Sequence, residues 1–379
     1  MLSVEILREL SETDKDTDLK ILNYMGQEKD KYSKFRGIIV DKESKMICPS
    51  FGHLEEKKID DIKDLENLEN WRFFPSYEGT LVRLYYHNES WRLSTHKKLS
   101  AFKSRWASRY SFGDIFLKNI KYIYNINLSD DKIFKWFTNQ LDKETIYFFL
   151  LRSNNQNRII CNVELNKKER CLLMAIYKNS NFILNTENFI FEIDILNEFL
   201  KMKEIRTDNL EKKLESINPF EYQGIVGFYN KEIKVIKILS KKYKEWMEIR
   251  GNNPNLRFRY LELRTEPEKL EKLYYLYPMY SQMFDDLDEI LNKISRDIYQ
   301  KYIYRYIKKQ YITVPNEEYN IMKKCHRWYL EDKENNKIFS KRVLHYIDNL
   351  STILKIKLIN NYYKSQNCFQ KLILDNIEN

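Results

Sequence analysis

Two runs of alternating side chains, separated by a short polar turn, constrain the fold of this chain most. Residues 80–86 (TLVRLYY) alternate along their length, and residues 91–95 (WRLST) alternate again after His87-Asn88-Glu89. A period of two is typical of β-strands, because successive side chains point to opposite faces of a sheet. The pattern predicts a β-hairpin with Glu78 and Gly79 at its entrance. Residues 224–229 and 233–239 predict a second hairpin.

The residues that enter the first hairpin carry a chemical pattern. Residues 76–83 read SYEGTLVR, which matches the motif Lys-x-Asp/Glu-Gly-Ser/Thr at every position except the first. In this stretch the chain resembles the phage-type RNA ligases of the covalent nucleotidyltransferase superfamily. The resemblance implies a lysine whose ε-amine attacks the α-phosphate of ATP to give a covalent lysyl-AMP. Ser76 stands at that position, and a hydroxyl cannot replace the amine because the phosphoramidate needs a nitrogen.

The resemblance extends over residues 30–245 with the family's order and spacing. The segments that are similar to it are FRGIIVD (35–41), CPSFG (48–52), WRLSTHKKL (91–99), FLLRSNNQNRII (149–160), YQGIV (222–226) and KILSKKY (237–243). It implies an α+β fold, in which a nucleotidyltransferase body of ATP-grasp-like antiparallel sheets and helices precedes an all-α C-terminal domain. The composition and the ligase-like body also resemble degenerate members of the family from large cytoplasmic DNA viruses.

The departures from the family pattern share one character, which is loss of charge at reacting positions. Ser76 replaces the nucleophile, Leu150 falls near a sugar-contacting carboxylate, Gln223 replaces a carboxylate and Leu239 replaces a second lysine. The carboxylate losses remove oxygen ligands that Mg²⁺ prefers. The resemblance therefore predicts no catalytic residue and no metal site, whereas an active protein would need ATP and Mg²⁺.

The retained family residues are able to shape a pocket and to touch phosphate. These candidate nucleotide- and phosphate-binding residues are Glu78, Gly79, Arg83, Arg158, Gly224 and Lys237. If they converge, a nucleotide or a nucleic-acid phosphate binds there without turnover. His96 lies beside the first hairpin and is a further candidate for phosphate contact or acid–base chemistry, although it has no visible partner.

The length of 379 residues favours two domains. We predict an RNA-ligase-like nucleotidyltransferase domain at 1–265 and a helical C-terminal domain at 266–379. Alternation becomes sparse after Pro267, and long amphipathic segments follow, at residues 270–280, 283–311 and beyond Pro315. Ser240 is expected to cap a helix over 241–250 that Gly251 ends.

The chain has 65 Lys+Arg against 55 Asp+Glu, a formal charge of +10, which favours polyanionic partners such as RNA. Lys97, Lys98, Lys103 and Arg105 are the candidate nucleic-acid-binding residues. If residues 99–109 are helical, Trp106 shares a core face while the cations line the others. Basic residues and tyrosines within 296–309 allow an RNA-facing stripe or, alternatively, tyrosines that pack on neighbouring helices.

Five cysteines without a CxxC pair indicate reduced thiols. Adjacent Cys325 and His326 point in different directions on a helix and predict no zinc site. No apolar run approaches the ~20 residues of a membrane helix. We therefore expect a soluble, cytoplasmic protein without a membrane partner, with the virion or a viral factory as further locations.

Three functions remain open at this point. The first is a catalytically degenerate RNA-ligase-like protein that binds RNA or a nucleotide in a scaffolding or regulatory role, with protein assembly through the C-terminal helical domain. The second is an active RNA ligase or related nucleotidyltransferase with an atypical nucleophile, for which Lys97 and Lys98 are the candidates. The third is a structural protein that retains only the fold.

Overall fold

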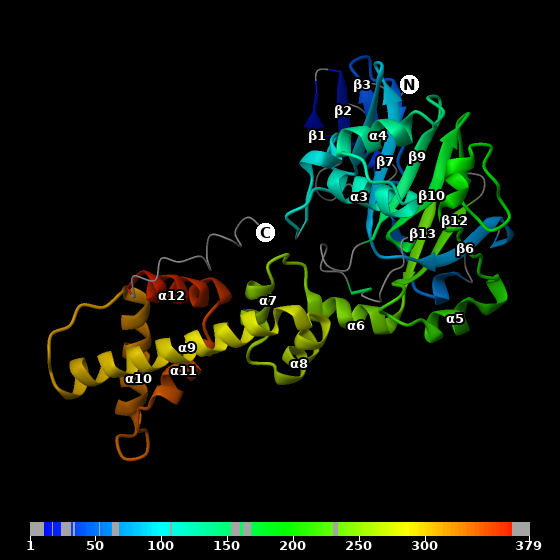
Figure 1. Ribbon diagram of the computed structural model, residues 1–379. Coiled ribbons are helices and arrows are strands. Elements are labelled where there is room, and N and C mark those ends of the chain that lie inside the picture. Colours follow the sequence, from blue (N-terminus) through cyan, green and yellow to red (C-terminus); the bar gives the residue numbers. More distant parts are fainter. Residues whose placement is uncertain are drawn as a thin grey trace. The chain divides into compact units, whose positions relative to one another are not determined.

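The chain forms two compact units, one within Met1–Trp246 and the other within Met247–Asn379 (Figure 1). We call the first the mixed unit and the second the helical unit. The computed structural model describes residues 11–16, 18–23, 32, 35–52, 54–62, 68–106, 108–152, 160–161, 168–229 and 234–365. Within these residues, no helix combines the length and the apolar character that crossing a membrane requires.

Three sheets make up the mixed unit. The first is antiparallel, in the order β1 (Ser11–Lys15), β2 (Leu19–Asn23), β3 (Ile39–Asp41), β4 (Met46–Cys48). The second is antiparallel, in the order β11 (Asn181–Leu184), β10 (Cys171–Lys178), β9 (Ile146–Leu151), β7 (Thr80–His87), β8 (Ser90–Thr95). The third has the order β5 (Glu55–Glu56), β13 (Val235–Leu239), β12 (Gly224–Tyr229), β6 (Trp71–Ser76), with only β5 parallel to its neighbour.

Helices cover one face of the five-stranded sheet. α3 (Phe112–Tyr124) and α4 (Asp130–Thr138) pack there, with Phe116 and Phe137 in an extensive apolar core (Figure 1). α3 begins at Phe112 because Ser111 accepts from the Asp114 N–H while the Asp114 carboxylate accepts from the Ser111 N–H.

The other face of this sheet packs on the sheet formed by β5, β13, β12 and β6. Leu172 and Met174 of β10 meet Val226 and Phe228 of β12 in a second apolar core. The far face of the sheet that contains β12 and β13 is covered by α5 (Leu210–Ser216). Leu210 of α5 packs in a third apolar core. Alternation along each strand thus supplies both faces of both sheets, which stack as two layers between helices.

In its described residues, the helical unit contains the end of α6 (Lys241–Arg250) and six further α-helices. They are α7 (Leu256–Leu263), α8 (Pro267–Leu276), α9 (Ser281–Tyr302) with its extension η9 (Ile303–Ile307), α10 (Asn316–Glu331), α11 (Ser340–Asp348) and α12 (Thr352–Ser365). α10, α11 and α12 all pack on the long α9 (Figure 1). Buried Arg264 pairs with Asp288 and Asp348, and Lys355 Nζ donates to the Leu261 carbonyl at 2.9 Å.

Several predicted elements are confirmed. β7 and β8 pair as the first hairpin, and β12 and β13 pair as the second. The α6 helix follows Ser240, whose Oγ accepts from the Tyr243 N–H at 3.1 Å, and it ends at Gly251 with a φ of +67°. Long helices dominate the second half of the chain as expected.

Two expectations differ from the structure. Residues 99–109 are not one helix, because only Ala101–Lys103 form a short 3-10 turn before the capping box starts α3. Trp106 nevertheless packs against the large helix–sheet core. The sequence placed the domain boundary after residue 265, whereas the compact units divide after Trp246, since α7 packs on α8, α9 and α12.

Candidate functional site

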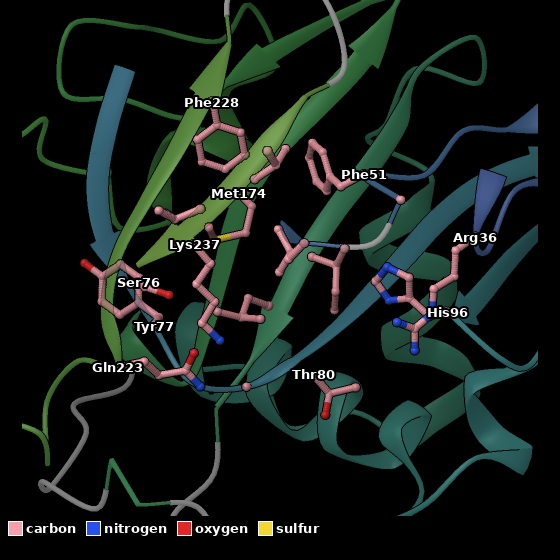
Figure 2. A pocket seen from close by; sticks show the side chains of 17 residues that line it. Arg36, Phe51, Ser76, Tyr77, Thr80, His96, Met174, Gln223, Phe228 and Lys237 are labelled. Carbon is pink, nitrogen blue, oxygen red and sulfur yellow. The ribbon is translucent and has the colours of Figure 1, made fainter. Parts of the chain in front are cut away.

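A cavity of about 460 Å³ opens between the five-stranded sheet and the sheet formed by β5, β13, β12 and β6 (Figure 2). Residues of both sheets and of the segments beside β4 and β8 line it. They are Arg36, Phe51, Gly52, Leu54, Ser76, Tyr77, Gly79, Thr80, Leu81, His96, Leu150, Met174, Gln223, Val226, Phe228, Val235 and Lys237. Its volume falls within the range of small-molecule pockets, roughly 300–1,000 Å³.

Main-chain pairing joins three strands that border the cavity, although Gly224 and Leu239 are not among the lining residues. Gly224 of β12 lies opposite Ser76 of β6 on one side and Leu239 of β13 on the other. A Cβ at Gly224 would lie 1.9 Å from the Ile238 carbonyl oxygen, so only glycine allows this approach. Gly79 is constrained in the same way, with the Leu151 carbonyl oxygen 2.4 Å from its ideal Cβ.

Ser76 and Gln223 form the polar end of the cavity. The Gln223 N–H donates to the Ser76 carbonyl at 2.8 Å, and the Ser240 N–H donates to the Gln223 carbonyl at 2.9 Å. The Gln223 side chain is buried and its Nε2 donates to the Tyr243 hydroxyl at 3.2 Å. An amide donor therefore occupies the position where the resembled family has a carboxylate acceptor.

The charged groups that line the cavity are cations. Lys237 rises from β13 between the aromatic and polar ends, and Arg36 lies on the other side next to His96 (Figure 2). Burial, together with the nearby Arg83 and Arg36 charges, lowers the pKa of His96 to about 3, which keeps this imidazole neutral at physiological pH. Among the described lining residues there is no carboxylate.

Apolar side chains form the remaining wall. Phe51 and Phe228 have ring centroids 5.8 Å apart, and Met174 lies between the two sheets beside them (Figure 2). Phe51 also packs on Phe148 and Phe182 at 5.0 and 4.7 Å. The cavity thus has an aromatic end and a polar end beside Lys237, with Arg36 and His96 on the opposite side (Figure 2).

Glu78 does not line the cavity. Its carboxylate is 4% exposed and accepts from the N–H groups of Ile160 and Cys161 at 2.8 and 2.9 Å. These are charge-assisted hydrogen bonds to a segment about eighty residues later in the chain. The structure gives Glu78 a role in holding this segment, which the sequence did not indicate.

Arg83 also lies away from the cavity. Its side chain is fully buried, and the guanidinium donates to the carbonyls of Gly37, Pro49 and Thr95. It thereby connects β7 to the segments that carry Arg36 and Phe51. The guanidinium contacts main-chain oxygens where the sequence suggested phosphate.

The other predicted residues divide between cavity, core and surface. Ser76, Gly79, Leu150, Gln223 and Lys237 line the cavity, and Leu239 is buried outside it. Arg158 lies outside the described residues. The four candidate nucleic-acid-binding residues are exposed, with the Lys98 Nζ 3.8 Å from the Asp14 carboxylate; they are Lys97, Lys98, Lys103 and Arg105.

The residues present do not fit a Mg²⁺ ion. Oxygen donors at the cavity are the neutral Ser76, Tyr77, Thr80 and Gln223. Mg²⁺ sites ordinarily use one or two carboxylates, and the described lining residues supply none. Throughout the described part of the chain, no group of three His, Cys, Asp or Glu side chains is arranged to hold a metal ion.

Sequence reasoning gave too little weight to Arg36 and to the aromatic end. Arg36 was visible as part of the FRGIIVD segment, and Phe51 as part of CPSFG. Phe228 and Met174 carried no signal beyond strand-like surroundings. Only the stacking of two sheets brings these four side chains around one cavity.

Comparisons with known proteins identify viral relatives. No family model matches the chain. It is 27% identical over 325 residues to the immediate-early protein ICP-46 homolog of Invertebrate iridescent virus 6, covering 77% of this chain and 67% of that protein. The homolog from Invertebrate iridescent virus 3 is 25% identical over 73% of this chain, and immediate-early protein ICP-46 of Frog virus 3 is 26% identical over 53%. The last two matches span 58% and 53% of those proteins.

Solved structures with a distant likeness are ligases. A putative ATP-dependent DNA ligase from Aquifex aeolicus aligns with a TM-score of 0.40 at 12% identity, over 80% of this chain and 78% of that one. A Naegleria gruberi RNA ligase with PPi aligns with a TM-score of 0.33 at 11% identity, over 53% and 59%.

Proposed function

We propose that the mixed unit binds a nucleotide in the cavity between its sheets without forming a covalent bond to it. The observation that carries this proposal is the lining of the cavity, in which cations and an aromatic wall are kept while the nucleophile and carboxylates are absent. The protein is then a catalytically degenerate relative of RNA-ligase-like nucleotidyltransferases.

The aromatic end suits a nucleobase. Phe51, Phe228 and Met174 present flat or polarisable apolar surface of the kind that contacts a heteroaromatic ring. A base inserted there would bury apolar area from both faces. Such burial stabilises a complex by roughly 25 cal/mol per Å² of apolar surface.

The polar end suits phosphate. Lys237 lies beside this end and Arg36 lines the opposite side of the cavity, so both supply positive charge for an anionic ligand (Figure 2). His96 is neutral at physiological pH and is able to donate a hydrogen bond to a phosphate oxygen. A nucleoside phosphate satisfies both ends at once, which a neutral apolar ligand would not.

The same lining argues against covalent transfer. The Ser76 hydroxyl offers no amine, and Gln223 donates through Nε2 to Tyr243 where a carboxylate would accept. The missing groups act as a set, because adenylyl transfer needs a nucleophile, charge neutralisation and leaving-group contacts together. We therefore favour binding over the active-ligase alternative.

We further propose a scaffolding or regulatory role with RNA as the polymer partner. The net charge of +10 supports a polyanionic partner. The viral relatives are named immediate-early proteins, which supports regulation more than a purely structural role. A cytoplasmic or virion location belongs to the same proposal.

Calorimetric measurement of the affinity of the full chain for ATP tests whether the cavity binds a nucleotide. Lys237→Ala should weaken binding about tenfold, since hydrogen bonds to charged groups contribute about 1.5–3 kcal/mol. Lys241→Ala, exposed at the start of α6, is the matched control and should leave the affinity unchanged. Undetectable ATP binding by the folded wild type would overturn the proposal and favour a structural role.

Incubation with α-labelled ATP and Mg²⁺ or Mn²⁺, followed by a denaturing gel, tests the absence of covalent chemistry. The wild type and Ser76→Lys should both remain unlabelled. Adding Leu150→Glu, Gln223→Glu and Leu239→Lys to Ser76→Lys gives labelling a better chance, although a charge at buried Leu239 costs about several kcal/mol. A wild-type label that is lost in a Lys97 or Lys98 variant would establish the active alternative.

A further inference from the structure

The long helix of the helical unit changes its geometry near its end. α9 continues into η9, a π-helical segment at Ile303–Ile307, where the Lys308 N–H donates to the Ile303 carbonyl at 2.9 Å. π-Helical turns are rare in proteins, and those that do occur are often found at functional sites. The wider turn changes the direction in which its side chains point. Here the turn leaves Tyr304 40% and Ile307 64% exposed.

A stack of rings fixes this segment on α10. Tyr302 and Tyr306 lie 5.1 Å apart, Tyr306 and His326 lie 4.1 Å apart, and His326 and Tyr329 lie 6.0 Å apart, with interplanar angles of 25–30°. The Tyr302 hydroxyl and His326 Nδ1 are 3.2 Å apart, within hydrogen-bond distance. The stack explains His326 as a packing residue and holds the π-helical turn in a defined position.

Cations gather around these rings. The Arg305 guanidinium lies 4.8 Å and the Lys323 ammonium 5.6 Å from the Tyr319 ring centre, while the Lys308 ammonium lies 4.8 Å from that of Tyr304. Burial lowers the pKa of His326, and the charges of Lys309 and Lys333 lower it further.

The nearby carboxylates are already engaged. Glu318 pairs with Lys301, and Glu317 pairs with Lys357. Within the described residues, none of five neighbouring cations has a carboxylate at ion-pair distance; they are Arg305, Lys308, Lys309, Lys323 and Lys333. Like charges that gather without counter-charges raise the free energy of the free protein, and a polyanion relieves this repulsion.

Aromatic rings project from the same segment into solvent. Tyr311 is 91% exposed and Tyr304 is 40% exposed, and both flank Lys308 and Lys309 in the chain. Exposed aromatic faces among cations match the requirements of an unpaired nucleic-acid strand, whose bases stack while its phosphates are neutralised. An acidic protein surface would use the cations and leave these rings without partners.

We propose that this cation–aromatic face, formed by η9, the loop after it and the adjoining face of α10, binds single-stranded nucleic acid. Phosphates contact Arg305, Lys308, Lys309 and Lys323, and bases stack on Tyr304 and Tyr311. The site lies entirely within the helical unit and does not depend on the nucleotide cavity.

Fluorescence anisotropy of a labelled, unstructured single-stranded oligonucleotide with the full chain measures this binding across a salt series. The variant Arg305→Gln/Lys308→Gln/Lys309→Gln should bind at least about tenfold more weakly, and its log–log salt slope should fall by about 2, or ~0.7 per lost phosphate contact. Lys212→Gln/Lys213→Gln/Lys272→Gln removes the same charge from other exposed positions and should change affinity less than about twofold.

A second variant separates stacking from charge. Tyr304→Leu/Tyr311→Leu should weaken binding about tenfold with the salt slope unchanged, because each stacked base contributes independently of salt. Lys237→Ala should leave strand binding unchanged, which distinguishes this face from the cavity. Equal loss in the two triple variants, equal affinity for duplex and single strand, or tighter binding to anionic lipid vesicles than to the strand would each overturn the proposal.

Discussion

The interior of the mixed unit and the exposed end of the helical unit use charged side chains in opposite ways. In the mixed unit, Arg83 and Glu78 are buried and hydrogen-bond to main-chain groups, and only Nε of the Arg83 guanidinium lacks a partner in the described structure. In the helical unit, Lys308 and Lys309 remain exposed beside tyrosines without carboxylate partners in the described structure. A charge that belongs to a sequence motif is therefore no guide to ligand contact until its surroundings are known.

The comparison separates stability from binding. Removing a buried, hydrogen-bonded charge leaves desolvated partners without a bond, so it lowers the free energy of unfolding. Removing an exposed charge costs little stability and changes the affinity for polyanions. Tryptophan fluorescence follows the mixed unit well, because Trp328 is the only tryptophan beyond residue 246.

The largest effect is expected for Arg83→Met. The change leaves the carbonyls of Gly37, Pro49 and Thr95 without their donor, and the free energy of unfolding should fall by about 3 kcal/mol or more. Urea denaturation followed by tryptophan fluorescence measures it. Arg327→Met, at an exposed position of the helical unit, should stay within about 0.5 kcal/mol of wild type. Equal free energies of unfolding for the two variants would contradict the stated difference between buried and exposed charges.

Glu78→Ala should have the next largest effect. It leaves the buried N–H groups of Ile160 and Cys161 unpaired and should destabilise the mixed unit by about 2 kcal/mol. Exposed Glu187→Ala is the control for loss of a carboxylate, with no expected change beyond about 0.5 kcal/mol. A stable Glu78→Ala protein with weakened ATP binding would instead place Glu78 at the ligand.

A smaller effect concerns pH. The pKa of His96 is lowered from 6.5 to about 3, so as pH falls from 6.5 toward 3 the unfolded state takes up a proton that the folded state does not. Stability is therefore full above pH 6.5 and is lost as pH falls through this window. Between pH 7 and pH 5.5, His96→Gln should lose about 1 kcal/mol less than wild type in urea denaturation. Identical pH slopes would contradict a neutral, buried imidazole.

The smallest effect is expected at the surface of the mixed unit. Lys97→Gln/Lys98→Gln/Arg105→Gln should weaken binding of the labelled strand only about two- to threefold, because these exposed cations lack the ring arrangement of the helical unit. Anisotropy titrations at low salt provide the measurement. A loss larger than that of the Arg305 triple variant would move the main nucleic-acid site to the mixed unit.

The elements with local signals were predictable from sequence. Alternation over 80–86 and 91–95 is a property of adjacent residues, and the structure forms that hairpin as β7 and β8. Ser240 and Gly251 similarly marked the ends of α6. The helix that the sequence allowed over 99–109 does not form, and the first helix of this region instead starts at Phe112 with the capping box at Ser111.

The destinations of the motif side chains were not predictable in the same way. Arg83 meets carbonyls 46 and 34 residues earlier in the chain, and Glu78 meets N–H groups more than 80 residues later. Main-chain atoms carry no sequence identity, so no residue pattern announces such partners. The aromatic end of the cavity required two sheets to stack, which is likewise a tertiary property.

The paired row of Ser76, Gly224 and Leu239 beneath the cavity has an evolutionary consequence. Backbone hydrogen bonds and one close glycine contact hold this row in place. Substitutions of the lining side chains therefore leave these main-chain contacts in place. A cavity that depends on main-chain contacts can persist through such substitutions, and its changed lining can then suit a different ligand.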